Sequence, residues 1–291
     1  MTWLFDVFLG PFAEFSFMRH ALAACLALAL GCGPVGVLLV LRRMSLSGDA
    51  LSHAVLPGAA AGFLLYGLSL PAMTIGGFLA GLGVVVLSGA VSRLTPLKED
   101  ASLAALYTIS LALGVLLVSM KGSSVDLMHV LFGSILAVDD ASLLLVAGVA
   151  TVTVLALAVL YRPLVAESFD PGFLSAVRGG GSVVHLAFMA LVALNLVGGF
   201  RSLGTLMSVG LLILPATAAR FWASQVWSQS LVATLVALGS GYFGLLLSYY
   251  QEWPSGPAIV LTAGACYLVS LCLGPRQGLL AQRLPKKHLQ H

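Results

Sequence analysis

Apolar residues follow one another in long blocks along this chain and do not alternate with polar residues. Stretches without any Asp, Glu, Lys or Arg recur at 20–41, 50–92, 101–120, 141–161, 179–200, 202–219, 221–251 and 253–275. A helix of about 20 residues crosses the hydrocarbon core of a bilayer, whereas a transmembrane strand alternates in polarity over about 10 residues. The pattern therefore predicts an all-α polytopic membrane protein.

The longest blocks exceed what one crossing needs and must be divided. The block 50–92 divides at "YGLSLP" (66–71), where Gly and Pro interrupt a helix. Nine transmembrane helices are then predicted, near 20–41, 50–66, 71–92, 101–119, 140–161, 183–199, 203–221, 229–248 and 256–274. The segment 125–140 is apolar for too few residues to span, and we expect a short re-entrant or interfacial helix there.

Composition agrees with a membrane protein, because 59% of the residues are hydrophobic and only 9% are charged, against roughly a quarter in soluble domains. If the N-terminus lies outside and the C-terminus in the cytoplasm, eleven of the fourteen Lys and Arg residues face the cytoplasm. Only Arg19, Lys121 and Arg201 remain outside, which is the asymmetry of the positive-inside rule. The net charge of +3 is explained by this placement and does not indicate a nucleic-acid partner.

The chain is expected to form one transmembrane domain, 1–291, because it contains no repeat and no Pro- or Ser-rich linker. Residues 1–18 are interpreted as an amphipathic approach on one membrane surface, without a cleaved signal. The largest cytoplasmic loop is predicted at 162–182, and a cytoplasmic tail at 275–291. The four cysteines lie in apolar runs without CxxC spacing and are expected to act as small hydrophobes.

Asp49 and His53 are the best candidates for chemistry, in the stretch "MSLSGDALSHAVLPG" (44–58). Their i, i+4 spacing places both on one helical face, and a carboxylate with an imidazole suits Mn²⁺, Fe²⁺ or Zn²⁺. Pro57 removes a backbone hydrogen bond one turn later and is expected to bend the helix, as a kink or gate. The alternative is that Asp49 only caps the helix while His53 bonds to a neighbouring carbonyl.

A second candidate is the cytoplasmic segment "ESFDPGFLSAVRGGG" (167–181), which turns at Asp-Pro-Gly and ends in three glycines. A short helix bounded by glycines is a suitable docking element for a partner protein. An ordinary amphipathic loop is the alternative.

Small residues predict where helices pack closely. "GAAAG" (58–62) and "GFLAG" (77–81) are small-xxx-small patterns that allow close approach in lipid. Asn195 is a lone amide within a span and is expected to form a hydrogen bond across helices.

The other titratable residues near span ends are interpreted as structural. His20, His129 and His185 are expected to form local hydrogen bonds and not to bind metal. Glu99 and Asp100 precede a span, where acidic residues favour a helix N-terminus, with a gate contact as the alternative.

Sequence motifs for ATP hydrolysis and other enzymatic activities are missing, since the chain has no GxxxxGK[ST], GxSxG or HExxH. The chain is therefore not expected to be an enzyme, and ATP-driven transport would need a separate ATPase subunit.

Taken in order, several stretches resemble the permease of bacterial zinc/manganese/iron ABC importers, the ABC-3 family, over about Arg19 to Gly274. They are "LRRMSLSGDALSHAVLPGAAAGFLL", "LKED", "DLMHVLFGSIL", "FDPGFLSAV", "GTLMSVGLLILPATAA" and "PSGPAIVL". The resemblance implies a BtuC/FecCD-like permease fold and a homodimer around a central path in the bacterial inner membrane.

It also implies partners and site residues. Each copy would rest on a cytoplasmic ABC ATPase, and an extracytoplasmic binding protein would deliver the metal. The metal-handling pair falls on Asp49 and His53, with the ion as transported cargo and no permanently bound cofactor. The ATPase-coupling loop of the family falls on Asp170, Pro171, Phe173, Ala176 and Gly179.

Two other classes of transporter remain open. One is a secondary metal carrier driven by an ion gradient, although no matching inverted halves are visible in the sequence. The other is a BtuC-like permease for metal chelates, which would need a wide cavity without metal ligands.

Overall fold

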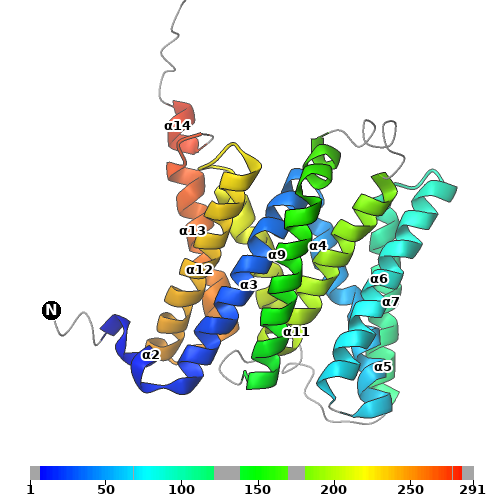
Figure 1. Cartoon of the computed structure of the whole chain (residues 1–291), viewed down its shortest axis with the longest axis horizontal. Coiled ribbons are helices and arrows are strands. Elements are labelled where there is room, and N and C mark those ends of the chain that lie inside the picture. The colour runs from blue at the N-terminus through cyan, green and yellow to red at the C-terminus, as the bar shows by residue number, and fades with distance from the viewer. Residues whose placement is uncertain (1–6, 68, 121–137, 170–180, 277, 284–291) are drawn as a thin grey trace, which may run out of the picture.

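The computed structural model describes residues 7–67, 69–120, 138–169, 181–276 and 278–283, and all regular structure in these ranges is helical (Figure 1). The helices are α2 (Gly10–Glu14), α3 (Ser16–Leu41), α4 (Ser45–Ala54), α5 (Leu56–Tyr66), α6 (Leu70–Leu94), α7 (Glu99–Met120), α9 (Asp140–Phe169), α11 (Gly181–Ala219), α12 (Val226–Gln251), α13 (Ser255–Leu273) and α14 (Leu279–Arg283).

Seven of the described helical segments are long and apolar enough to cross a membrane, with mean hydropathy from 1.7 to 2.7 in the best window. Two shorter passages add to them, namely α4 followed by α5, and the second half of α11. Over the described residues this agrees with the nine predicted helices and with the all-α polytopic fold.

The centre of the bundle is α3, which packs against α9, α11 and α12. Its apolar side chains are buried around most of its circumference, as expected for a helix that is hydrophobic on all sides. It begins at Ser16, so the predicted surface approach 1–18 ends earlier than expected, and the short helix α2 lies directly before α3.

The chain folds back within α11 at Gly204, whose φ of 79° and ψ of 162° are accessible to glycine and rare for other residues. A Cβ atom on Gly199 would overlap the Ser208 hydroxyl. In a straight helix, positions 199 and 208 would lie about 13 Å apart along the axis. Their close contact therefore requires that the chain turns back between them. The segments Gly181–Phe200 and Gly204–Ala219 are therefore two passes, as the two predicted spans require.

Helices α5 and α6 approach each other closely at glycines. A Cβ on Gly58 would overlap the Gly76 carbonyl, and one on Gly62 would meet the backbone of Ala72. Gly77 lies against the Val55 side chain in the same way. The close packing predicted for "GAAAG" and "GFLAG" is confirmed.

The predicted loop 162–182 is too long at both ends. Helix α9 continues through Pro163 to Phe169, and α11 begins at Gly181. The helix continues because this last part is packed, with Leu164 fully buried and Glu167 nearly so. The charge of Arg162 ended the apolar block in the sequence without ending the helix.

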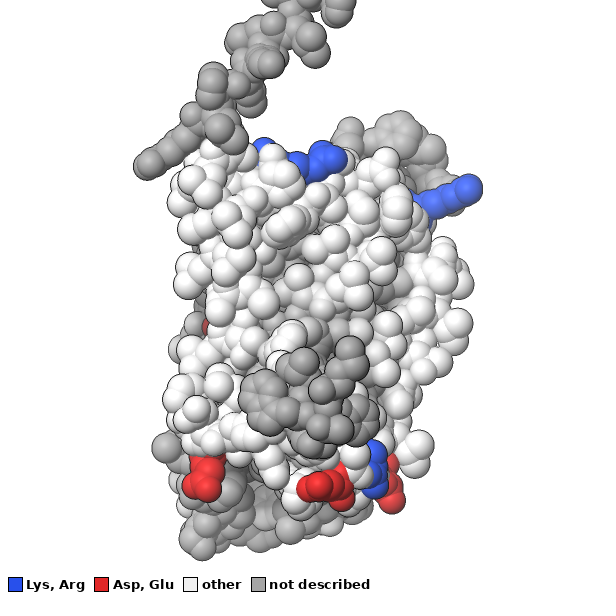
Figure 2. All heavy atoms as spheres, turned by 90° about the vertical axis from the view of Figure 1, so that its left-hand side faces the viewer, with Lys and Arg blue, Asp and Glu red and all other residues white. Residues whose placement is uncertain are grey.

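On the face that Figure 2 shows, basic side chains lie at one end of the molecule, and acidic side chains lie at the opposite end together with a basic one. The basic end carries the end of α3, the start of α7, the end of α9 and the start of α11. Among the residues predicted outside, Arg19 lies near the start of α3, at the other end.

Candidate functional site

Asp49 and His53 lie together on α4, with Asp49 Oδ1 4.0 Å from His53 Nε2. Their side chains are 58% and 30% exposed, and both line a cavity of about 440 Å³. The rest of its wall is Ser52 of α4, the second half of α11, and Val260 of α13. An ion about 2.1 Å from each ligand atom can bridge a pair at this separation, so the donors fit a divalent metal cargo.

One edge of the His53 ring is buried. Its Nδ1 atom has no hydrogen-bond partner among the described residues, and the ring stacks on Tyr107 of α7, with centroids 6.2 Å apart. The exposed part of the ring therefore carries Nε2, the atom nearest Asp49. Nε2 lies 4.0 Å from Asp49 Oδ1, which is longer than a hydrogen bond, so a cation could lie between these two atoms.

The helix that carries this pair is interrupted one turn later. Helix α4 ends at Ala54 and α5 begins at Leu56, with Pro57 in its first turn. Ser110 of α7 donates a hydrogen bond of 3.0 Å to the Ala54 carbonyl. A neighbouring helix thus donates to one backbone carbonyl at the break between α4 and α5.

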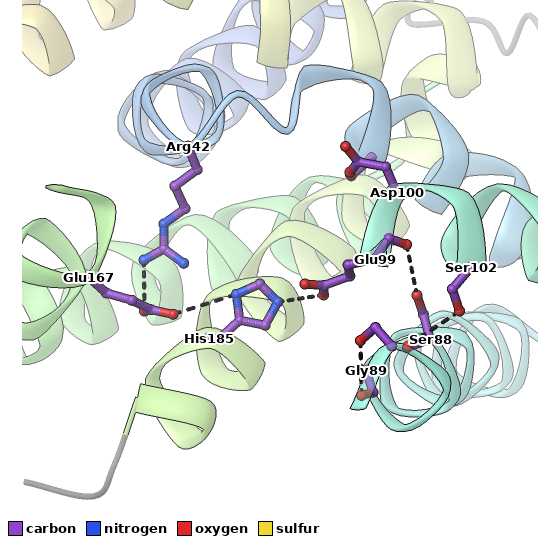
Figure 3. Close-up of polar contacts among 10 residues, drawn as sticks. Arg42, Ser88, Gly89, Glu99, Asp100, Ser102, Glu167 and His185 are labelled. Carbon is purple, nitrogen blue, oxygen red and sulfur yellow. Dashed lines mark hydrogen bonds and ion pairs between the residues drawn. The ribbon is translucent and has the colours of Figure 1, made fainter. Parts of the chain in front are cut away.

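A second polar cluster, the four-residue charge network, joins Arg42, Glu167, His185 and Glu99 at the basic end (Figure 3). Arg42 Nη2 lies 3.0 Å from Glu167 Oε2. His185 lies between the two carboxylates, with Nδ1 3.5 Å from Glu167 Oε1 and Nε2 2.7 Å from Glu99 Oε1. The members belong to four different elements, so the network ties the ends of α3, α7, α9 and α11 together.

Arg42 is the most firmly held member. Its guanidinium also donates to Ser168 Oγ at 3.1 Å and to the Leu164 carbonyl at 3.2 Å, and it lies 4.1 Å from the centre of the Phe188 ring. Burial lowers the pKa of Arg42, and the Glu167 carboxylate opposes that shift. Such a buried cation is tolerable because a carboxylate and two neutral acceptors surround it.

The sequence interpretation missed this network. Arg42 counted only towards the cytoplasmic charge, Glu99 was expected to support a helix N-terminus, and His185 to form local bonds. One signal in the sequence could have indicated it. Glu167 and His185 lie close to apolar stretches on either side of the same predicted loop, where a charged and a titratable residue could pair.

The remaining predicted residues fall into three groups. Asn195 donates to Thr153 Oγ1 at 2.9 Å, which confirms the expected bond between helices. His20 lies 3.3 Å from Asp140, and both side chains are substantially exposed. His129 lies outside the described residues, as do the predicted coupling residues Asp170, Pro171, Phe173, Ala176 and Gly179.

Within the described residues, no three His, Cys, Asp or Glu side chains converge as a ready metal site. Two ligands facing a cavity suit an ion that must pass on, whereas structural metal sites usually have four.

The chain is similar to known membrane transport proteins. The sequence profile of the ABC 3 transport family matches residues 14–274. The manganese import system permease protein ScaB of Streptococcus parasanguinis is 35% identical over 270 residues, which cover 93% of this chain and 95% of that protein. The chelated iron transport system membrane protein YfeD of Yersinia pestis is 30% identical, covering 93% and 90%.

A solved structure agrees with the fold. PsaBC from Streptococcus pneumoniae, determined in complex with Fab, superposes with a TM-score of 0.84 at 32% identity, covering 95% of this chain and 99% of that one.

Proposed function

Since the chain belongs to the ABC 3 transport family, we propose that it is the permease subunit of an ATP-driven importer of a divalent transition metal ion. The observation that carries this proposal is the Asp49–His53 pair on the wall of a cavity, directly before a helix break. Intramembrane ionisable groups that face a cavity mark ion pathways.

Manganese is the proposed cargo. Carboxylate oxygen suits Mn²⁺, imidazole nitrogen extends the range to Zn²⁺ and Fe²⁺, and no thiolate is among the cavity residues. The similarity to ScaB, a manganese import permease, supports this choice. YfeD, which carries chelated iron by its name, makes an iron cargo the second candidate.

The proposed assembly follows from what the chain lacks. Sequence motifs for ATP hydrolysis are absent, so a cytoplasmic ABC ATPase would supply energy through the segment 170–179, and an extracytoplasmic binding protein would deliver the ion. A second copy of the chain would close the open side of the cavity. The proposed location is the bacterial inner membrane, with the N-terminus outside and the basic end in the cytoplasm.

Metal uptake into proteoliposomes that contain the permease, its ATPase and its binding protein tests the proposal. Mutation of a residue that only supports a metal ligand typically lowers metal affinity or activity about 10- to 100-fold. Asp49 and His53 are proposed as the ligands themselves, so Asp49→Asn and His53→Gln should each lower uptake at least about tenfold. His20→Gln is the matched control, because it changes a histidine beside a carboxylate away from the cavity, and its uptake should stay at the parent level.

Three results would contradict the proposal. Normal uptake in both variants would remove the pair from transport. Uptake that follows an ion gradient without ATP would instead indicate a secondary carrier. Uptake of a chelate in place of the free ion would indicate the chelate class.

A further inference from the structure

The four-residue charge network lies apart from the proposed metal path. None of its members lines the cavity of Asp49 and His53. Arg42, Glu99, Glu167 and His185 instead line a separate cavity of about 400 Å³ at the basic end. The function proposed for the Asp49–His53 pair therefore does not explain why the protein has this network.

Stability alone does not explain such a network. The Arg42 and Glu167 side chains are only 6% and 8% exposed, and the desolvation of a buried ion pair offsets much of its attraction. Apolar side chains of similar size often stabilise a fold as well as a buried pair does. A buried pair does, however, fix one geometric relation between the elements that carry it.

Two members lie next to the segment proposed to contact the ATPase. Glu167 precedes Asp170 by three residues on α9, and His185 follows Gly181 by four residues on α11. Each is on a rigid helix that leads directly to one end of that segment. A displacement of the segment that moves the end of α9 or the start of α11 would therefore reach Glu167 or His185.

The other two members lie next to the helix with the metal pair. Arg42 directly follows α3 as its C-cap, and Arg43, with a left-handed φ of 60°, turns the chain towards α4. Glu99 begins α7, where its neighbour Asp100 accepts a 3.4 Å hydrogen bond from Ser47 of α4. Arg42 is thus connected to the start of α4 by a short stretch of chain, and Glu99 by its neighbour Asp100, while Asp49 lies in the next turn of α4.

The network has room for a second arrangement. The Nη1 atom of Arg42 is buried without a hydrogen-bond partner among the described residues. In Figure 3, Glu99 lies across His185 from Arg42, at the far end of the chain of contacts. If the contact between His185 and Glu99 opens, Arg42 Nη1 can donate a hydrogen bond to the Glu99 carboxylate while His185 keeps its contact with Glu167, so the network can exchange partners without leaving a charge unpaired.

We propose that Arg42, Glu99, Glu167 and His185 are positioning residues that transmit movement of the ATPase-facing segment to α4, and so change the affinity of the Asp49–His53 pair for its ion. This inference rests on the proposed function. It assigns the network a role in coupling, through α4, and no contact with the cargo.

The test compares Mn²⁺ binding and Mn²⁺ uptake in the assembled transporter. Binding is measured on the purified complex without nucleotide and with ATP held unhydrolysed, and uptake is measured per ATP hydrolysed in proteoliposomes. In Glu99→Gln and His185→Gln, Mn²⁺ affinity without nucleotide should equal that of the parent, because the cavity is untouched. The nucleotide-dependent change in affinity should be lost, and ions moved per ATP should fall about 3- to 30-fold.

Thr153→Val is the matched control. It removes the buried Asn195–Thr153 hydrogen bond, which joins the same helices α9 and α11 away from the loop and from α4. This variant should lower stability while keeping the parental number of ions per ATP. If neither charge variant assembles, Ser47→Ala removes only the hydroxyl that links α4 to Asp100 and should show a smaller loss in the same direction.

The outcomes separate this inference from the proposed function. If the parent complex takes up no Mn²⁺, Zn²⁺ or Fe²⁺, the proposed function fails. If the parent transports and the variants keep both the nucleotide effect and the parental ions per ATP, the coupling role is refuted. A loss of Mn²⁺ affinity without nucleotide, or an equal loss of coupling in Thr153→Val, would likewise refute it, because both indicate general loosening of the fold.

Discussion

Removing one charge of the Arg42–Glu167 pair should destabilise the protein far more than removing both. The two side chains meet at 3.0 Å and are almost fully buried. Breaking such a pair costs about 3–5 kcal/mol, because the remaining charge is left in an environment that solvates it poorly.

The surroundings decide which single change costs more. Arg42→Met leaves Glu167 with His185, whose Nδ1 is 3.5 Å away, so its cost should lie near 3 kcal/mol, the lower end of the range. Glu167→Met leaves the guanidinium hydrogen-bonded to neutral acceptors only, with Glu99 as a more distant carboxylate, so its cost should lie near 5 kcal/mol, the upper end of the range. Arg42→Met/Glu167→Met leaves no uncompensated charge and should cost less than about 2 kcal/mol, so the coupling energy, which is the sum of the two single costs minus the cost of the double change, should be at least about 6 kcal/mol.

Equilibrium unfolding of the purified chain in mixed detergent micelles, followed by tryptophan fluorescence, measures the four free energies. Additive effects of the two single changes would refute the reasoning, since they would mean that water or lipid headgroups solvate each charge. Asp140→Asn is the control, because the His20–Asp140 pair is close but exposed, and exposed pairs contribute about 0–1 kcal/mol.

Two further predictions concern packing and proton competition. Gly58→Leu should lower the free energy of unfolding by at least about 1–3 kcal/mol, because the new side chain would overlap the Gly76 carbonyl. Gly83 has open space around it, so Gly83→Leu should be neutral or stabilising in the same assay. Mn²⁺ binding to the parent should weaken as the pH falls from neutral to acid, because protons compete with the ion for Asp49 and His53. Titration of Mn²⁺ into the purified permease at several pH values measures this. Tighter binding in acid would argue against these two ligands.

The fold could largely be predicted from sequence because the bilayer limits the choices. A crossing needs a minimum apolar length, and Arg201 divided two apolar blocks where the chain turns back at Gly204. The same rule failed at Arg162, where α9 continues to Phe169. A charge ends an apolar block in the sequence, but a helix continues past it when later side chains such as Leu164 remain packed.

Prediction of the site succeeded where the partners are local and failed where they are distant. Asp49 and His53 are one helical turn apart, so α-helical geometry alone brings them together. The charge network joins residues 42, 99, 167 and 185, whose contacts depend on which helix ends meet. Hydropathy defines each helix but not its neighbours, so these pairings could not be read from the pattern.

The two histidine and carboxylate arrangements use the same chemical groups for opposite purposes. An imidazole binds a metal through a nitrogen lone pair, and both ring nitrogens of His185 already lie beside carboxylate oxygens. His185 has no nitrogen free for an ion while these contacts hold. His53 keeps Nε2 4.0 Å from Asp49, at the wall of an open cavity. A passing cation therefore has a place at His53 and none at His185, where the same groups contact one another and join the ends of four helices.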